Sequence, residues 1–206
     1  MSVDVAVKFA DAVLTARLTV PRRPVGLVVL VPGAADALID AVADALQRAD
    51  LAVLCSVDPS TGEQRSVDQL TGRVVALTRW ARQDPGTCEL PLGYFATGLG
   101  AAAALRAAAE LDGEVAAVVC SQGRADLVGA RVAAVTAATL LVVGGADPVA
   151  LDRNGGLEPL LRCRSALEIV PGASRRFDEA GAVDRVVDLA TDWFRTNLDT
   201  HLDTHP

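Results

Sequence analysis

The chain has 206 residues, of which 51% are apolar and 22% are charged, a balance that is typical of one soluble globular domain. Nineteen basic and 26 acidic residues give a net charge of −7, and an acidic chain with few aromatic rings is a poor candidate for binding nucleic acid. No apolar run reaches the roughly 18 residues that a membrane-spanning helix needs, and the amino terminus lacks a basic segment. We therefore expect neither a membrane partner nor a signal peptide.

The chain opens with two segments, 3–9 and 12–20, in which apolar and polar residues alternate. Alternation with a period of two is typical of strands with one solvated face, so these segments predict an antiparallel hairpin at the edge of a sheet. Unbroken apolar runs follow, and such runs are typical of parallel strands that are buried on both faces. They lie at residues 26–31, 51–57, 116–120 and 139–145, and two further strands are predicted at 90–96 and 165–170.

Between the apolar runs, apolar residues recur with the spacing of one helical face, in residues 39–49, 70–81 and 182–198. Strand–helix alternation predicts an α/β fold in which helices cover both faces of a mostly parallel sheet of about eight strands. We expect one domain over residues 1–199 and a flexible tail at 200–206.

The four cysteines, Cys55, Cys88, Cys120 and Cys163, form no C-x-x-C pair. This spacing gives no support to a zinc site or a redox motif, and buried thiols are the simpler interpretation. We expect no metal, no cofactor and a reducing, cytoplasmic setting.

Ligands of such sheets bind at the carboxyl ends of the strands, so the turns there are the first candidates for a site. The segment Ala96–Gly100 passes from a strand into an alanine-rich helix, with small residues on both sides of the apex at Gly98. This pattern has the form of the nucleophile elbow, in which small flanking residues let the strand and the helix approach closely.

The segments GYFATGLGAAAAL, TLLVVGGADPV and ALEIVPGASRRF together resemble the α/β hydrolases, and among them the small dienelactone hydrolases without a lid domain. The resemblance covers nearly the whole chain. It implies a serine nucleophile at the elbow, an acid after the next-to-last strand and a histidine after the last strand. It also implies an oxyanion loop after residues 26–31.

Set against this pattern, the chain keeps the acid, Asp147, but has Gly98 at the nucleophile position and Arg175 near the histidine position. Its two histidines, His201 and His205, lie in the tail, at the far edge of the predicted sheet. The oxyanion loop also looks shortened. Glycine offers no nucleophile and arginine cannot act as a base, so we predict a catalytically impaired relative that acts by ligand binding or assembly.

Two alternatives stay open. One is an active ester or lactone hydrolase with a displaced nucleophile at Thr97, Cys120 or Ser121, and Asp58 or Asp147 as the base. The other is a structural partner subunit, and a homo-oligomer is compatible with the sequence. Dinucleotide binding through the G-x-G-x-x-A pattern at 98–103 is less favoured, because no acid ends the next strand.

The loops that carry Asp147 and Arg175 should meet, as acid and histidine do in the family. We expect a salt bridge between them, with an anion site formed by Arg175, Arg176 and the helix start at Leu99–Gly100 as the functional alternative. The ligand would then be a small anion. The full set of candidate ligand-binding residues is Pro32, Gly33, Ala34, Thr97, Gly98, Leu99, Gly100, Ser121, Asp147 and Arg175.

Overall fold

The structure, a computed structural model, describes residues 1–10, 12–32, 37–56 and 66–198. The predicted positions Gly33, Ala34, Asp58, His201 and His205 lie outside these residues.

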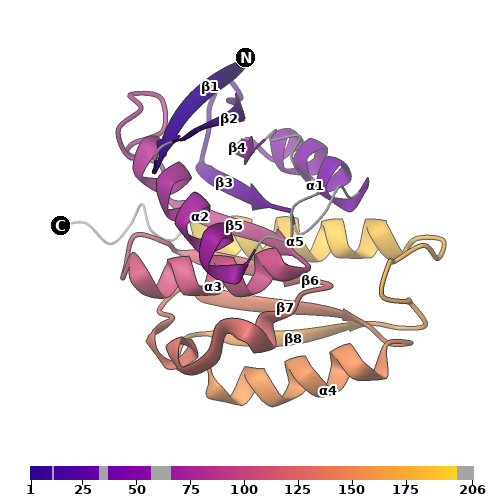
Figure 1. The fold of residues 1–206 in the computed structure, drawn as a ribbon. Helices are drawn as coiled ribbons and strands as arrows, with labels where there is room; N and C mark the ends of the chain where they lie inside the picture. The colour runs from indigo at the N-terminus through magenta and orange to yellow at the C-terminus, as the bar shows by residue number, and fades with distance from the viewer. Residues whose placement is uncertain (11, 33–36, 57–65, 199–206) are drawn as a thin grey trace.

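An eight-stranded sheet forms the centre of the molecule, in the order β1-β2-β4-β3-β5-β6-β7-β8 (Figure 1). The hairpin strands β1 and β2 are antiparallel, β2 pairs antiparallel with β4, and the remaining strands run parallel to one another. This arrangement confirms the predicted sheet. The strands span β1 (Ser2–Phe9), β2 (Ala12–Thr19), β3 (Gly26–Val31), β4 (Leu51–Ser56), β5 (Leu92–Thr97), β6 (Ala117–Ser121), β7 (Ala138–Gly144) and β8 (Ser165–Val170).

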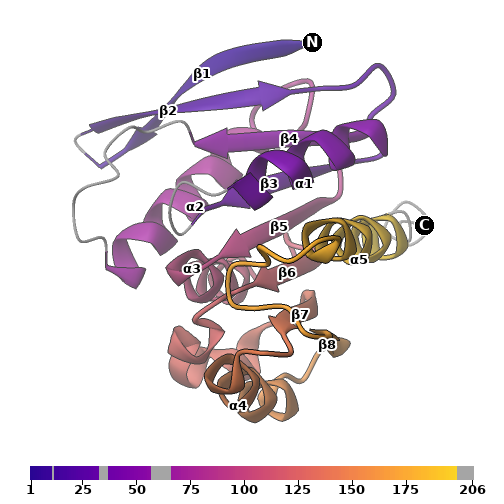
Figure 2. The same ribbon diagram turned by 90° about the vertical axis from the view of Figure 1, so that its right-hand side faces the viewer.

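Helices cover both faces of the sheet, and the turned view of Figure 2 shows them on its two sides. Two apolar clusters, one on each face, account for this layering: α1 and α5 contribute to one, and α2 and α3 to the other. Apolar side chains on both faces of the parallel strands explain their unbroken apolar runs. The helices are α1 (Ala37–Arg48), α2 (Val67–Ala81), α3 (Leu99–Glu110), α4 (Pro148–Leu157) and α5 (Ala182–Leu198).

Two short 3₁₀ segments, η1 (Ala125–Ala134) and η2 (Glu158–Leu160), connect the later elements. The segment η1 is two pieces joined at Gly129, whose φ of 68° breaks the helical path. It follows β6 and packs against α3 and α4, so it helps to form the carboxyl-terminal side of the sheet where the predicted site lies.

Candidate functional site

The turn between β5 and α3 has the backbone conformation of an elbow. Thr97 is the last residue of the strand, Leu99 is the first of the helix, and Gly98 between them has φ 53° and ψ −129°. A positive φ with this ψ strains a residue with a side chain, and glycine adopts it readily. The structure thus has Gly98 at the predicted apex with the predicted positive φ, a conformation that glycine adopts without the strain a side chain would bring.

Gly100 allows α3 to approach the sheet. A Cβ atom at this position would overlap the carbonyl oxygen of Val31, at the end of β3. The requirement for a small residue two positions after the apex is thus a packing requirement between helix and strand, and it needs no bound dinucleotide to explain it.

The neighbouring turn, after β6, is tied to the elbow. Thr97 and Ser121 lie opposite each other in the parallel register, and Gln122 then takes a φ of 54°. The backbone N–H of Arg124 donates to the carbonyl oxygen of Gly98 at 2.9 Å. The two strand ends therefore form one connected backbone unit.

Asp147 follows β7 and serves as the N-cap of α4. Its Oδ1 accepts a hydrogen bond from the backbone N–H of Ala150 at 2.9 Å, while Pro148 occupies the first helical position. Aspartate is among the preferred N-cap residues, because its carboxylate satisfies a helix N–H that has no partner within the helix. The acid of the family pattern thus has a structural task in this chain.

The predicted salt bridge between Asp147 and Arg175 is wrong. Both side chains lie in the described part of the chain, yet no nitrogen–oxygen pair joins them within the 4.0 Å limit of an ion pair. The physical reason is that Arg175 is exposed to water on the loop after β8, while the helix start holds the Asp147 carboxylate through its Oδ1. A hydrated guanidinium gains little from such a surface contact.

Asp147 and Arg175 nevertheless line one cavity of about 360 Å³ at the carboxyl ends of β6, β7 and β8. Its lining combines three arginines, one acid, one amide and three small or apolar residues. They are Gln122, Gly123, Arg124, Asp147, Val149, Ala150, Arg153 and Arg175.

One of the three arginines is already paired. Arg124 forms a bidentate contact with Asp126, with Nε to Oδ1 at 2.9 Å and Nη2 to Oδ2 at 3.0 Å. These hydrogen bonds hold the pKa of Asp126 below its ordinary value, and the charge of Arg153 acts in the same direction. In the described part of the chain, neither Arg153 nor Arg175 has a carboxylate partner within 4.0 Å. The cavity therefore has two arginines, Arg153 and Arg175, that form no ion pair among the described residues, and we call them uncommitted cations.

The residues proposed as displaced nucleophiles are buried. Ser121 is 0% exposed, Thr97 is 2% exposed and Cys120 is 2% exposed. Burial raises the pKa of the Cys120 thiol to about 12, which leaves almost no thiolate at neutral pH. None of the three lines the cavity.

The cavity is displaced from the elbow toward β8. Of the predicted ligand-binding set it includes Asp147 and Arg175, while Pro32, Leu99 and Gly100 do not line it. Sequence analysis missed Gln122, Arg124 and Arg153. The first two could have been found from their position directly after a buried strand, and Arg153 from its place one turn after Val149 on the helix that Asp147 begins.

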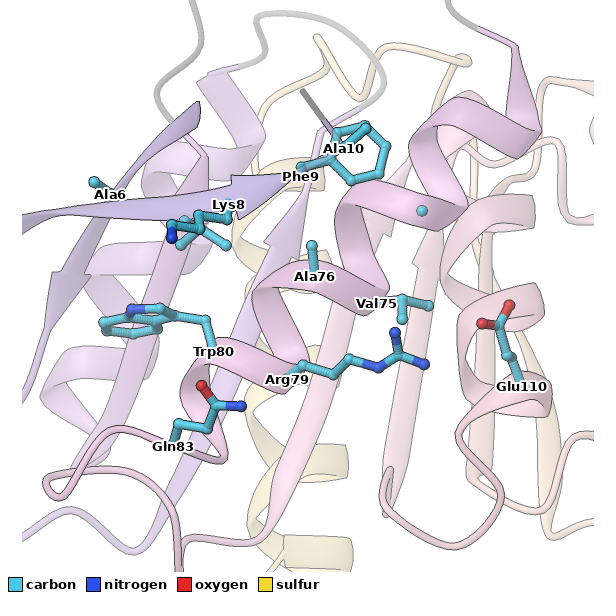
Figure 3. Close-up of a pocket in the computed structure, with 12 residues that line it drawn as sticks. Ala6, Lys8, Phe9, Ala10, Val75, Ala76, Arg79, Trp80, Gln83 and Glu110 are labelled. Atoms are coloured by element: carbon cyan, nitrogen blue, oxygen red, sulfur yellow. The ribbon is translucent and has the colours of Figure 1, made fainter. Parts of the chain in front are cut away.

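A larger hollow of about 680 Å³ lies between the amino-terminal hairpin and α2 (Figure 3). Lys8 and Phe9 border it from β1, Arg79 and Trp80 from α2, and Glu110 from the last position of α3. Since the elbow lies at the first position of α3, this hollow extends toward the opposite end of that helix. It holds no arrangement of nucleophile and base.

Within the described ranges, no group of three histidine, cysteine, aspartate or glutamate side chains could hold a metal ion. In the same ranges no helix has both the length and the apolar character to cross a membrane.

Among solved structures, a dienelactone hydrolase from Anabaena variabilis superimposes with a TM-score of 0.91 and 34% sequence identity, over 96% of this chain and 98% of that one. A serine hydrolase without a lid from Xanthomonas campestris has a TM-score of 0.77 at 19% identity, over 96% of this chain and 95% of that one. The second likeness concerns the fold alone, and it agrees with the absence of a lid from the described elements.

Among curated proteins, the chain is 36% identical over 205 residues to two proteins of Mycobacterium tuberculosis, one from each of two strains, and both carry the name phosphoribosyl transferase. Each alignment covers 95% of this chain and 46% of the relative, so the chain spans about half the length of these relatives. No protein-family model matches the chain. Its fold, its elbow and its likeness to the Anabaena enzyme over the full length of both show that the chain belongs to the dienelactone hydrolase family of α/β hydrolases.

Proposed function

We propose that this chain is a non-catalytic member of its family that binds a small anion in the cavity beside Asp147. The observation that carries the proposal is Gly98 at the apex of an intact elbow. The turn keeps the strained backbone that presents a nucleophile in this fold, but its apex residue has no side chain.

Acyl transfer needs a nucleophile and a base within hydrogen-bond reach of each other. Arg175 stands where the resemblance implies a histidine, and an arginine side chain does not serve as a general base. Asp147, the remaining member of the family set, is engaged with the start of α4. The chain therefore lacks the nucleophile and the base, two of the three side chains that the covalent mechanism needs.

The alternative of a displaced nucleophile is less well supported. A substrate would have to reach Ser121 or Cys120, and both are enclosed in the core. Cys120 would in addition require a thiolate that burial disfavours.

Anion binding is supported by the composition and position of the cavity. Arg153 and Arg175 bring two positive charges without a carboxylate partner among the described residues, and the first turn of α4 contributes the positive end of its dipole through Val149 and Ala150. The name of the Mycobacterium tuberculosis relatives refers to a phosphoribosyl group, which is itself an anion, in a protein about twice as long. Phosphate esters are therefore the first anions to test.

The experiment is isothermal titration of the protein with inorganic phosphate, and in parallel with acetate, at constant ionic strength. We expect saturable binding of phosphate, weakened at least about fivefold by Arg175→Gln, since one charge-assisted hydrogen bond is worth 1 kcal/mol or more. Arg176→Gln changes the adjacent exposed arginine, which does not line the cavity, and should leave the affinity unchanged. Failure of both anions to bind would refute the anion-binding function.

A further inference from the structure

The cavity is not built for a bare anion, because it also contains a carboxylate. Asp147 lines the same space as Arg153 and Arg175. A negative group in the wall repels phosphate, so it lowers the affinity for an inorganic anion unless the ligand brings hydrogen-bond donors to it.

The second oxygen of Asp147 is available for such donors. Its Oδ1 accepts the N–H of Ala150, and no hydrogen bond to Oδ2 occurs among the described residues. A carboxylate oxygen has no proton to donate, so its natural partners in a ligand are hydroxyl groups. The cap holds the carboxylate in a fixed orientation before any ligand arrives.

The amide of Gln122 adds a further polar group at the cavity. Its Nε2 atom is buried and has no hydrogen-bond partner in the described structure. A buried donor without a partner costs free energy, and rotation of this side chain toward a ligand oxygen in the cavity would relieve this cost. The backbone of Gln122 is held by its N–H, which donates to the carbonyl oxygen of Val142 at 3.3 Å, so the side chain starts from a fixed point after β6.

Of the three arginines at the cavity, one is held in an ion pair and two form none among the described residues. Arg124 is held by Asp126, and this pair is close to neutral overall. Arg153 and Arg175 approach the cavity from α4 and from the loop after β8, on two separate segments. Together with Asp147 they leave a net charge of about one positive unit facing the ligand, which suits a phosphate monoester better than a neutral sugar.

We infer that the ligand is a phosphorylated sugar, with its phosphate on Arg153 and Arg175 and its hydroxyl groups on Asp147 and Gln122. This inference rests on the proposed anion-binding function and names the class of ligand for the same cavity. The volume of about 360 Å³ lies in the range of pockets that hold small metabolites.

The test is isothermal titration with ribose 5-phosphate, inorganic phosphate and unphosphorylated ribose as three separate probes. We expect ribose 5-phosphate to bind at least about tenfold more tightly than inorganic phosphate, and ribose not to bind, since a hydrogen bond to a charged group contributes about this factor.

Asp147→Asn distinguishes the contribution of the sugar hydroxyl groups to the affinity from that of the phosphate. Asparagine caps a helix as well as aspartate does, so α4 should keep its start and the melting temperature should change little. Without the negative charge, inorganic phosphate should bind as tightly as before or more tightly, while the tenfold preference for ribose 5-phosphate should shrink to threefold or less. Arg175→Gln should weaken both phosphorylated probes together, and Arg176→Gln neither.

The outcomes distinguish this inference from the proposed function. If inorganic phosphate and ribose 5-phosphate bind equally, and Asp147→Asn affects both alike, the phosphorylated-sugar inference is overturned while anion binding stands. If neither phosphorylated probe binds, both fail.

Discussion

At the scale of single residues, Gly98 relieves a strain that a nucleophile would impose. Its φ of 53° and ψ of −129° lie outside the regions that side-chain-bearing residues prefer. Enzymes of this fold tolerate such strain because the side chain must project from the turn. In this chain the conformation persists without that side chain, which indicates that the packing of β5 against α3 maintains it.

Gly98→Ser should therefore lower the free energy of unfolding by about 1–2 kcal/mol, the cost of a strained backbone at a residue with a side chain. Urea denaturation measures this change. Gly156→Ser is the matched control: Gly156 lies in α4 with open space around it, and serine there should be neutral or slightly stabilising because its helix propensity exceeds that of glycine. If Gly98→Ser proved neutral, the apex would not be strained and the elbow assignment would fail.

Buried thiols should make stability depend on pH. Burial raises the pKa of Cys120 to about 12 and that of Cys55 to about 11, whereas a thiol in the unfolded chain titrates near 8.5. Above that pH the unfolded chain loses protons that the folded chain keeps, so the free energy of unfolding falls as pH rises.

Between pH 8.5 and 10 the contribution of Cys120 to this loss should reach about 2 kcal/mol. Urea denaturation at both pH values should show a clearly smaller loss for Cys120→Ala than for the unchanged protein. Val118→Ala removes a buried side chain of the same strand that does not titrate, so it should lower stability but keep the pH dependence. Equal losses for Cys120→Ala and the unchanged protein would contradict the buried-thiol account.

At the scale of elements, the approach of α3 to β3 determines the shape of the elbow. A methyl group on Gly100 would overlap the carbonyl oxygen of Val31, and backbone atoms cannot move aside as a flexible side chain can. The alanine-rich face of α3 has the same cause, because small side chains let the helix lie close to the sheet.

Gly100→Ala should accordingly destabilise the fold by about 1–3 kcal/mol through overpacking, although alanine favours helix. Gly156→Ala, in α4 with nothing within 4 Å of the added Cβ, should instead stabilise it by about 0.5–1 kcal/mol. Thermal or urea unfolding of the two variants gives the comparison. A stabilising Gly100→Ala would mean that α3 does not touch β3.

Elements with a strong apolar period could be predicted from the sequence, and irregular ones could not. The bounds of β3 and β8 match the prediction. An apolar run buried on both faces has clear ends in β3, whereas β8 is a half-buried edge strand. The segment η1 escaped prediction, since its two short pieces around Gly129 follow no sustained period.

The candidate site was predictable only in part. The resemblance placed Asp147 and Arg175 on neighbouring loops, and the structure brings both to one cavity. Whether two such side chains form an ion pair depends on competing partners, here the N–H of Ala150, and on solvent exposure, which sequence spacing does not encode. The place of Arg153 on α4, one turn after Val149, could be read from the sequence, but many exposed arginines of a helix face solvent, so its position at a cavity could not.

At the scale of the whole molecule, the net charge of −7 opposes the approach of an anion, whereas the two arginines of the proposed site would attract it locally. Binding there must depend on close contacts of Arg153 and Arg175, since salt screens the distant charges more strongly than a partly enclosed contact. The chain thus keeps the family fold with Gly98 at its elbow, and Arg153 and Arg175 line the neighbouring cavity with Asp147.

The most direct test of this account is covalent labelling with a fluorophosphonate probe, read by intact-protein mass spectrometry beside an active serine hydrolase. An activated serine adds the probe, and this account predicts no mass increase, together with no hydrolysis of p-nitrophenyl acetate above a heat-denatured control. Stoichiometric labelling of the folded protein, lost on Ser121→Ala or Thr97→Val and accompanied by ester turnover, would contradict the central claim that the chain has an elbow without a nucleophile.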